Sequence, residues 1–134
     1  MPLTLILGPM KSGKSFELLS RFYPLQYSQE KFALFHPQLN VRDEMVCSRN
    51  GVGMETFKVK NLKPALNTEY TVIGIDEIHM FAREDMDTVE ELLFRRVDVI
   101  ISGLDTDYQG KLFTNIMRLL EMGPDQVIFK KAVC

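Results

Sequence analysis

The sequence contains few cysteines, no long apolar run and no large excess of charge. Cys47 and Cys134 are the two cysteines in 134 residues, too few for a disulfide framework or a zinc site of paired ligands. The mostly apolar stretches Leu3 to Leu7 and Val97 to Ile101 are far shorter than the roughly 20 residues that cross a bilayer. The N-terminus also lacks the basic lead of a signal peptide. We therefore expect a cytoplasmic protein without disulfides, zinc or a membrane span.

The charges are nearly balanced, with 16 basic and 18 acidic side chains and a formal net charge of -2. This balance gives no electrostatic footprint for nucleic acid or an anionic membrane, so an anionic ligand needs a local site. Hydrophobic residues make up 46% of the chain and charged residues 25%, a composition typical of a soluble globular domain. A chain of this length buries roughly two-thirds of its unfolded surface, and we expect one domain over residues 1–134.

Apolar patterns along the chain alternate between strand-like and helix-like segments. Strands are expected at 3–7, 31–35, 57–59, 71–75, 97–102 and 127–129. Helices are expected from 14 to about 29, with a kink or early end at Pro24, and at 85–96 and 114–122. Residues 37–56 and 103–113 read as loops. Continuous apolar strands alternating with helices predict an α/β domain of three layers with a mainly parallel sheet covered on both faces.

The strongest motif is a phosphate-binding loop that lies between the first expected strand and helix. Its pattern is G-x-x-x-x-G-K-[ST], formed by Gly8, Pro9, Met10, Lys11, Ser12, Gly13, Lys14 and Ser15. The glycines let the backbone curl so that successive N–H groups point at phosphates. Lys14 would reach the β- and γ-phosphates, and the Ser15 hydroxyl would bind Mg²⁺. The motif therefore predicts a P-loop fold and a binding site for Mg·ATP.

Two adjacent carboxylates, Asp76 and Glu77, follow the apolar strand that ends at Ile75. Ligands bind at the carboxyl ends of strands in open α/β sheets, and in P-loop proteins an Asp at this place holds Mg²⁺. Neighbouring residues of a strand point to opposite faces, so the two carboxylates are expected to have different roles. One carboxylate would face the metal and the other a nucleophile.

Other polar residues near these motifs allow more than one interpretation. His79 either contacts a nucleotide or is an ordinary loop histidine. Arg42 and Arg49, in the long loop, either clamp phosphate or are solvated. His36 ends a strand before Pro37 and is expected to be structural.

Several blocks together resemble the zinc-containing, cytosolic type of thymidine kinase, the type II deoxynucleoside kinase family. They are G-P-M-x-S-G-K-S, V-I-G-I-D-E, the segment from Gly103 to Gly110, and Lys131-Ala132-Val133-Cys134. Their order and approximate spacing match over nearly the whole chain. The resemblance implies a RecA-like P-loop domain that transfers the γ-phosphate of ATP to the 5′-hydroxyl of thymidine and assembles into tetramers.

The resemblance also assigns roles to individual residues. Glu77 is the general base. Residues Asp76, Glu77, Ile78 and His79 line the nucleotide site, together with the P-loop and with Arg42 of a segment similar to the family's D-x-R element. The apolar nucleoside pocket consists of Met10, Leu104, Tyr108 and Phe113. The family usually has Gln where this chain has His79.

The family continues past A-V-C into a small domain with zinc-binding cysteines and a lasso loop that covers thymidine. This sequence stops at Cys134, which matches the first of those cysteines, so no zinc is expected. Without the lid, we expect weak binding of thymidine and leakage of phosphate to water. The alternatives to a deoxynucleoside kinase are an inactive or regulatory ATP-binding module and a partner-stimulated ATPase.

Overall fold

The computed structural model describes residues 2–9, 13–27, 30–38, 56–66, 69–104 and 113–131, without the side chains of Ser15 and Gln26. The strands are β1 (Leu3–Leu7), β2 (Phe32–Pro37), β3 (Thr56–Val59), β4 (Val72–Ile75), β5 (Asp98–Gly103) and β6 (Gln126–Phe129). The α-helices are α1 (Lys14–Ser20), α3 (Asp85–Phe94) and α4 (Thr114–Glu121). Three short 3-10 turns are η1 (Tyr23–Tyr27), η2 (Lys63–Leu66) and η3 (Ile78–Met80).

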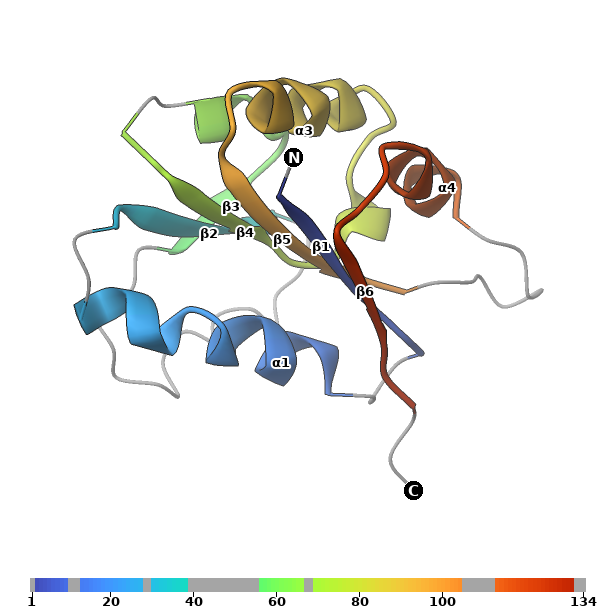
Figure 1. Ribbon diagram of the computed structural model, residues 1–134. Coiled ribbons are helices and arrows are strands. Elements are labelled where there is room, and N and C mark those ends of the chain that lie inside the picture. Colours follow the sequence, from blue (N-terminus) through green and yellow to red (C-terminus); the bar gives the residue numbers. More distant parts are fainter. Residues whose placement is uncertain are drawn as a thin grey trace.

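The six strands form one sheet in the order β3-β2-β4-β5-β1-β6, and every neighbouring pair is parallel. Helix α1 lies on one face of the sheet, and α3 and α4 lie on the other (Figure 1). The predicted α/β fold with a parallel sheet is thereby confirmed, and it is the architecture expected for a P-loop domain. Within the described ranges, no helix is long and apolar enough to span a membrane.

Strand β1 shows how the sequence pattern fills both faces of the sheet. Leu3, Leu5 and Leu7 pack into the larger core cluster, which includes the apolar side chains of α3 and α4. Ile6 points the other way and packs with Leu18 and other residues of the α1 side. Because successive side chains of a strand alternate between faces, an uninterrupted apolar strand is buried on both sides.

The core cluster between α1 and the sheet is the smaller of the two and is tightly filled. A Cβ at Gly74 of β4 would come within 2.6 Å of the side chains of Phe22 and Leu34, so only glycine leaves room for them. Helix α1 ends at Ser20, and η1 follows around Pro24, as the early end at this proline predicted.

The predicted strands and helices are confirmed with small shifts at their ends. Helix α3 ends at Phe94 and not at Arg96, because Arg96 takes a left-handed conformation with φ 64°. The Val97 N–H bonds to the Leu92 carbonyl at 3.0 Å, which closes the helix in the manner usually supported by glycine. The sequence pattern did not predict η2 or η3. Since all strands are parallel, their carboxyl ends share one edge of the sheet, which we call the carboxyl edge.

Candidate functional site

The phosphate-loop motif follows β1 at the carboxyl edge of the sheet. Gly13 precedes α1 with φ 84°, a left-handed conformation that glycine adopts without strain. The Lys14 ammonium donates a hydrogen bond to the Pro9 carbonyl at 2.8 Å, so it lies across the loop. Lys130, just after β6, pairs with Glu17 of α1 at 3.4 Å and flanks the same loop. The predicted strand-to-helix setting of the motif is therefore present.

A buried polar cluster lies at the end of the neighbouring strands. Asp76 is only 3% exposed, and its Oδ1 accepts hydrogen bonds from the Ser102 hydroxyl at 2.5 Å and from the Glu77 N–H at 3.0 Å. Its Oδ2 lies 3.5 Å from His36 Nδ1, and His36 is 1% exposed. Burying a carboxylate is costly unless it is paired and hydrogen-bonded, and here three elements supply the partners. Sequence reasoning treated His36 as structural and missed Ser102.

The backbone turns between Asp76 and Glu77. Glu77 is left-handed, with φ 52° and ψ 51°, and it is the N-cap residue directly before η3. The expectation that the pleat of a strand separates the two carboxylates was wrong, because Glu77 is no longer extended. The two side chains differ in burial: Asp76 belongs to the buried cluster, while Glu77 is half-buried at the start of the turn.

His79, inside η3, contacts two residues of the expected nucleoside pocket. Its Nδ1 accepts a hydrogen bond from the Leu104 N–H at 3.1 Å, and its ring centroid lies 5.2 Å from that of Phe113. Burial, reinforced by the positive charge of Lys14, lowers the pKa of His79 to about 4, against an opposing effect of Asp76. The ring is therefore neutral at pH 7 with its proton on Nε2, and the charges of Lys14 and Asp76 act on it from the phosphate-binding side.

A cavity of about 380 Å³ opens beside η3 and the start of α4. Its lining residues are His79, Phe81, Arg83, Phe113, Thr114 and Asn115. Asn115 is 6% exposed, and its amide donates to the Ile78 carbonyl at 2.9 Å and to the Phe81 carbonyl at 2.7 Å. No sequence pattern points to Arg83 or Asn115, because an Asn in the first turn of a helix is common and Arg83 belongs to no motif.

The sequence profile of the thymidine kinase family matches residues 1–134. The chain belongs to the thymidine kinase family. The thymidine kinase of Mycoplasma mobile is 37% identical over 134 residues, which cover 96% of this chain and 66% of that protein. Those of Thermococcus kodakarensis and Pseudothermotoga lettingae are 34% and 33% identical, over 98% of this chain and over 72% and 74% of their own lengths. The chain thus spans about two thirds to three quarters of these thymidine kinases.

The structure brings together part of the site that the thymidine kinase resemblance assigns. Gly8, Pro9, Gly13 and Lys14 form the described part of the phosphate loop, and Asp76, Glu77, Ile78 and His79 follow β4 at the same edge. Leu104 and Phe113 both contact His79. The predictions for Met10, Lys11, Ser12, Arg42 and Tyr108, and for the Ser15 hydroxyl, lie outside the described residues.

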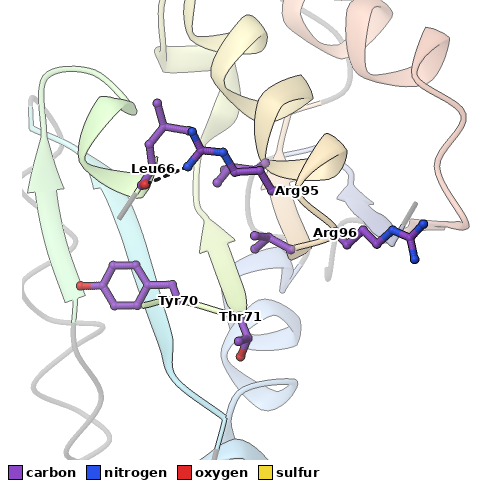
Figure 2. A pocket seen from close by; sticks show the side chains of 7 residues that line it. Leu66, Tyr70, Thr71, Arg95 and Arg96 are labelled. Carbon is purple, nitrogen blue, oxygen red and sulfur yellow. Dashed lines mark hydrogen bonds between the residues drawn. The ribbon is translucent and has the colours of Figure 1, made fainter. Parts of the chain in front are cut away.

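A second cavity, of about 310 Å³, lies at the amino ends of the strands, away from the thymidine kinase motifs. It is lined by Leu66, Tyr70, Thr71, Leu92, Arg95, Arg96 and Val97. Figure 2 shows that Arg95 folds over to the Leu66 carbonyl, at 3.2 Å, and that Arg96 extends away from the cavity. Among the described residues, no three His, Cys, Asp or Glu side chains gather closely enough to hold a metal ion by themselves.

Proposed function

We propose that this chain transfers the γ-phosphate of ATP to the 5′-hydroxyl of thymidine. The observation that carries the proposal is the arrangement at the carboxyl edge: the phosphate loop with Lys14, the buried Asp76, and Glu77 at the turn next to the nucleoside residues. The family relationship supports both the donor and the acceptor. A thymidine kinase needs these three parts within one site, because the donor phosphate and the acceptor hydroxyl must meet.

The donor side consists of the loop from Gly8 to Ser15 together with Asp76, with Arg42 as a further phosphate contact. Mg²⁺ in ATP-using enzymes takes oxygen ligands from one or two side chains and from the phosphates themselves. The Asp76 carboxylate and the Ser15 hydroxyl are oxygen donors of this kind, and the buried Asp76 is held in place by Ser102. Bound Mg·ATP supplies the transferable phosphoryl group with its charge partly neutralised. Lys14 adds a positive charge at the phosphates.

The acceptor side consists of Met10, Leu104, Tyr108 and Phe113, which would hold the apolar face of a pyrimidine. Glu77 acts there as general base and takes the proton of the acceptor hydroxyl, which is a poor nucleophile at neutral pH. Its position at the head of η3 supports this role, because the same turn contacts Leu104 and Phe113 through His79.

The substitution Glu77→Gln tests the chemistry, because it keeps the shape of the side chain and removes its basicity. We expect formation of thymidine monophosphate to fall by roughly two orders of magnitude or more, with the affinity for ATP unchanged. The exposed Glu121→Gln on α4 is the control and should leave turnover unchanged. Release of phosphate from ATP by the wild type without any thymidine monophosphate would contradict the kinase function.

We also infer that the protein works as a homo-oligomer in the cytoplasm, a tetramer by family resemblance. Phe16 of α1 is 75% exposed and Tyr27 of η1 is 87% exposed, and large aromatic side chains at the surface suit a contact between subunits. Light scattering measures the assembly directly. A monomer at micromolar concentration, or an oligomer unaffected by a Phe16→Ser and Tyr27→Ser double variant, would contradict this assignment of the surface.

A further inference from the structure

The short turn η3 is held from outside by a side chain that belongs to none of the sequence motifs. Asn115, in the first turn of α4, uses its amide to bind the carbonyls of Ile78 and Phe81, at 2.9 and 2.7 Å. These carbonyls lie at the two ends of the turn. The side chain is 6% exposed, so water does not compete effectively for these bonds, and the loss of a buried hydrogen bond is costly.

Glu77 is the N-cap residue of this turn. Its left-handed backbone, with φ 52°, is uncommon for a residue other than glycine. Such a conformation persists only where the surrounding structure determines it, and it is found often at functional sites. The turn has few internal bonds of its own: the Met80 N–H binds the Glu77 carbonyl at 2.9 Å and the Phe81 N–H binds the Ile78 carbonyl at 3.1 Å. The amide of Asn115 adds the two bonds that attach this turn to the helix.

The same turn contacts residues at the two ends of the connection between β5 and α4. On the β5 side, the Leu104 N–H binds His79 at 3.1 Å. On the α4 side, Phe113 packs against His79, and Asn115 follows two residues later. Residues that are distant in the sequence, at 77–81, 104 and 113–115, are thereby joined through hydrogen bonds and one ring contact.

We propose that Asn115 is a positioning residue for phosphoryl transfer, which fixes Glu77 relative to the nucleoside-binding residues Leu104 and Phe113. The inference rests on the proposed function, since it takes Glu77 as the base. Proton transfer requires hydrogen-bond distance between the base and the acceptor hydroxyl, and a misplacement of about 1 Å costs roughly 100-fold in rate. Asn115 acts on the reaction through the turn and touches no reacting atom.

The substitution Asn115→Leu tests the proposal, because leucine has a similar volume and no donor for the two carbonyls. We expect kcat for thymidine to fall by roughly 10- to 100-fold while the Kd for ATP, measured by calorimetry, stays within about twofold. Asn115→Gln keeps both N–H donors on a longer arm and should recover part of kcat. If the leucine variant does not fold, Asn115→Ser, which keeps one hydroxyl donor, takes its place.

The matched control is Ile116→Val, at the next position of α4. Ile116 is fully buried in the larger core cluster, so this change perturbs the same helix while both hydrogen bonds of the Asn115 amide remain. It should leave kcat unchanged. Equal losses of kcat in the leucine variant and this control, or no recovery with Asn115→Gln, would overturn the proposal.

A second measurement separates failure of this proposal from failure of the proposed function. Amide hydrogen exchange at Met80 and Phe81 reports the turn itself and needs no turnover. Asn115→Leu should speed exchange at both amides by at least tenfold and leave exchange in β1 unchanged. If the wild type makes no thymidine monophosphate, the proposed function fails; unchanged exchange at the turn in the variant shows instead that Asn115 does not hold it.

Discussion

The carboxyl and amino edges of the sheet each border a cavity, of about 380 and 310 Å³, and each carries charged side chains. At the carboxyl edge the polar groups are buried and bind one another across strands, as Asp76 does with Ser102 and His36. At the amino edge they are exposed: Arg95 pairs with Glu91, one helical turn away, at 2.8 Å, and donates to the Leu66 carbonyl at 3.2 Å.

This difference makes the cavity at the carboxyl edge the candidate functional site. Burying a carboxylate costs free energy, and a fold keeps such a group where it serves chemistry or a unique packing arrangement. Exposed ion pairs cost little and contribute little. Neither cavity volume nor a left-handed backbone separates the two edges, because Arg96 at the amino edge is left-handed as Glu77 is, whereas the burial of Asp76 does so.

The largest difference between the edges is expected in the affinity for ATP after one cationic side chain is removed at each edge. Lys14→Ala should weaken binding of ATP by about 10- to 100-fold, because hydrogen bonds to charged groups contribute about 1.5–3 kcal/mol. Arg95→Ala, at the amino edge, should leave the ATP affinity unchanged. Calorimetry on both variants checks the pair, and an unchanged affinity in a folded Lys14→Ala protein would contradict the assignment of the phosphate loop.

A second pair compares hydroxyl groups at the two edges. Ser102→Ala removes a buried donor to Asp76 and should lower the free energy of unfolding by about 1–3 kcal/mol. The exposed Thr71 hydroxyl contacts Glu30 and the Lys31 carbonyl, and Thr71→Ala should change stability by no more than about 0.5 kcal/mol. Urea denaturation measures both. Equal losses would show that burial does not distinguish the edges.

Acid should weaken the carboxyl edge through His79. The pKa of His79 is about 4 in the folded protein, below its ordinary value of 6.5, so the unfolded chain takes up the proton first as the pH falls. The stability from neutral His79 is present above pH 6.5 and is lost as the pH falls toward 4. Thermal denaturation between pH 7 and 4 should show a smaller loss for His79→Gln than for the wild type, because glutamine also accepts a hydrogen bond but does not titrate.

Acid should have the opposite effect at the amino edge through Asp98. Burial first, and then the charges of Glu30 and Asp125, raise the pKa of Asp98 above its ordinary value of 3.8. The folded protein therefore binds this proton at a higher pH than the unfolded chain, and stability rises as the pH falls through the raised pKa. Asp98→Asn should remove that rise, so acid should destabilise this variant more steeply than the wild type.

The smallest effect is expected at Arg96, where a left-handed backbone closes α3 at the amino edge. Arg96→Gly should raise the free energy of unfolding by on the order of 0.5 kcal/mol, since relief of the strain outweighs the greater entropy of the unfolded glycine. ATP binding should not change. A destabilised variant would mean that the arginine side chain holds the turn by contacts that the strain argument ignores.

Much of the fold follows from the sequence, whereas less of the site does. Apolar runs and helical spacing predicted β1, β4, α3 and α4, because burial on one or two faces leaves a periodic pattern. The phosphate-loop motif and the Asp76–Glu77 pair predicted a site at the carboxyl ends of the strands, and both lie at that edge. The partners of Asp76 were not predictable, because His36 and Ser102 come from the two strands that flank β4, and strand order leaves no local pattern. The left-handed turn at Glu77 was missed because glutamate does not mark such a turn.

The strand order also determines when, during synthesis, the strand before the phosphate loop can join the sheet. Among the described strands, β1 is made first, but it pairs with β5 and β6. Leu3 lies opposite Val99 and Thr4 lies opposite Gln126, so β1 can pair only after these later residues have been made. Strands β2, β3 and β4 can pair with one another before β5, which pairs with the other edge of β4, has been made. Contacts between distant parts of a chain slow folding, and a nascent chain emerges at roughly 5–20 residues per second. The half of the sheet without the phosphate loop therefore becomes able to assemble on the ribosome seconds before β5 and β6, which flank the strand of the phosphate loop, have been made.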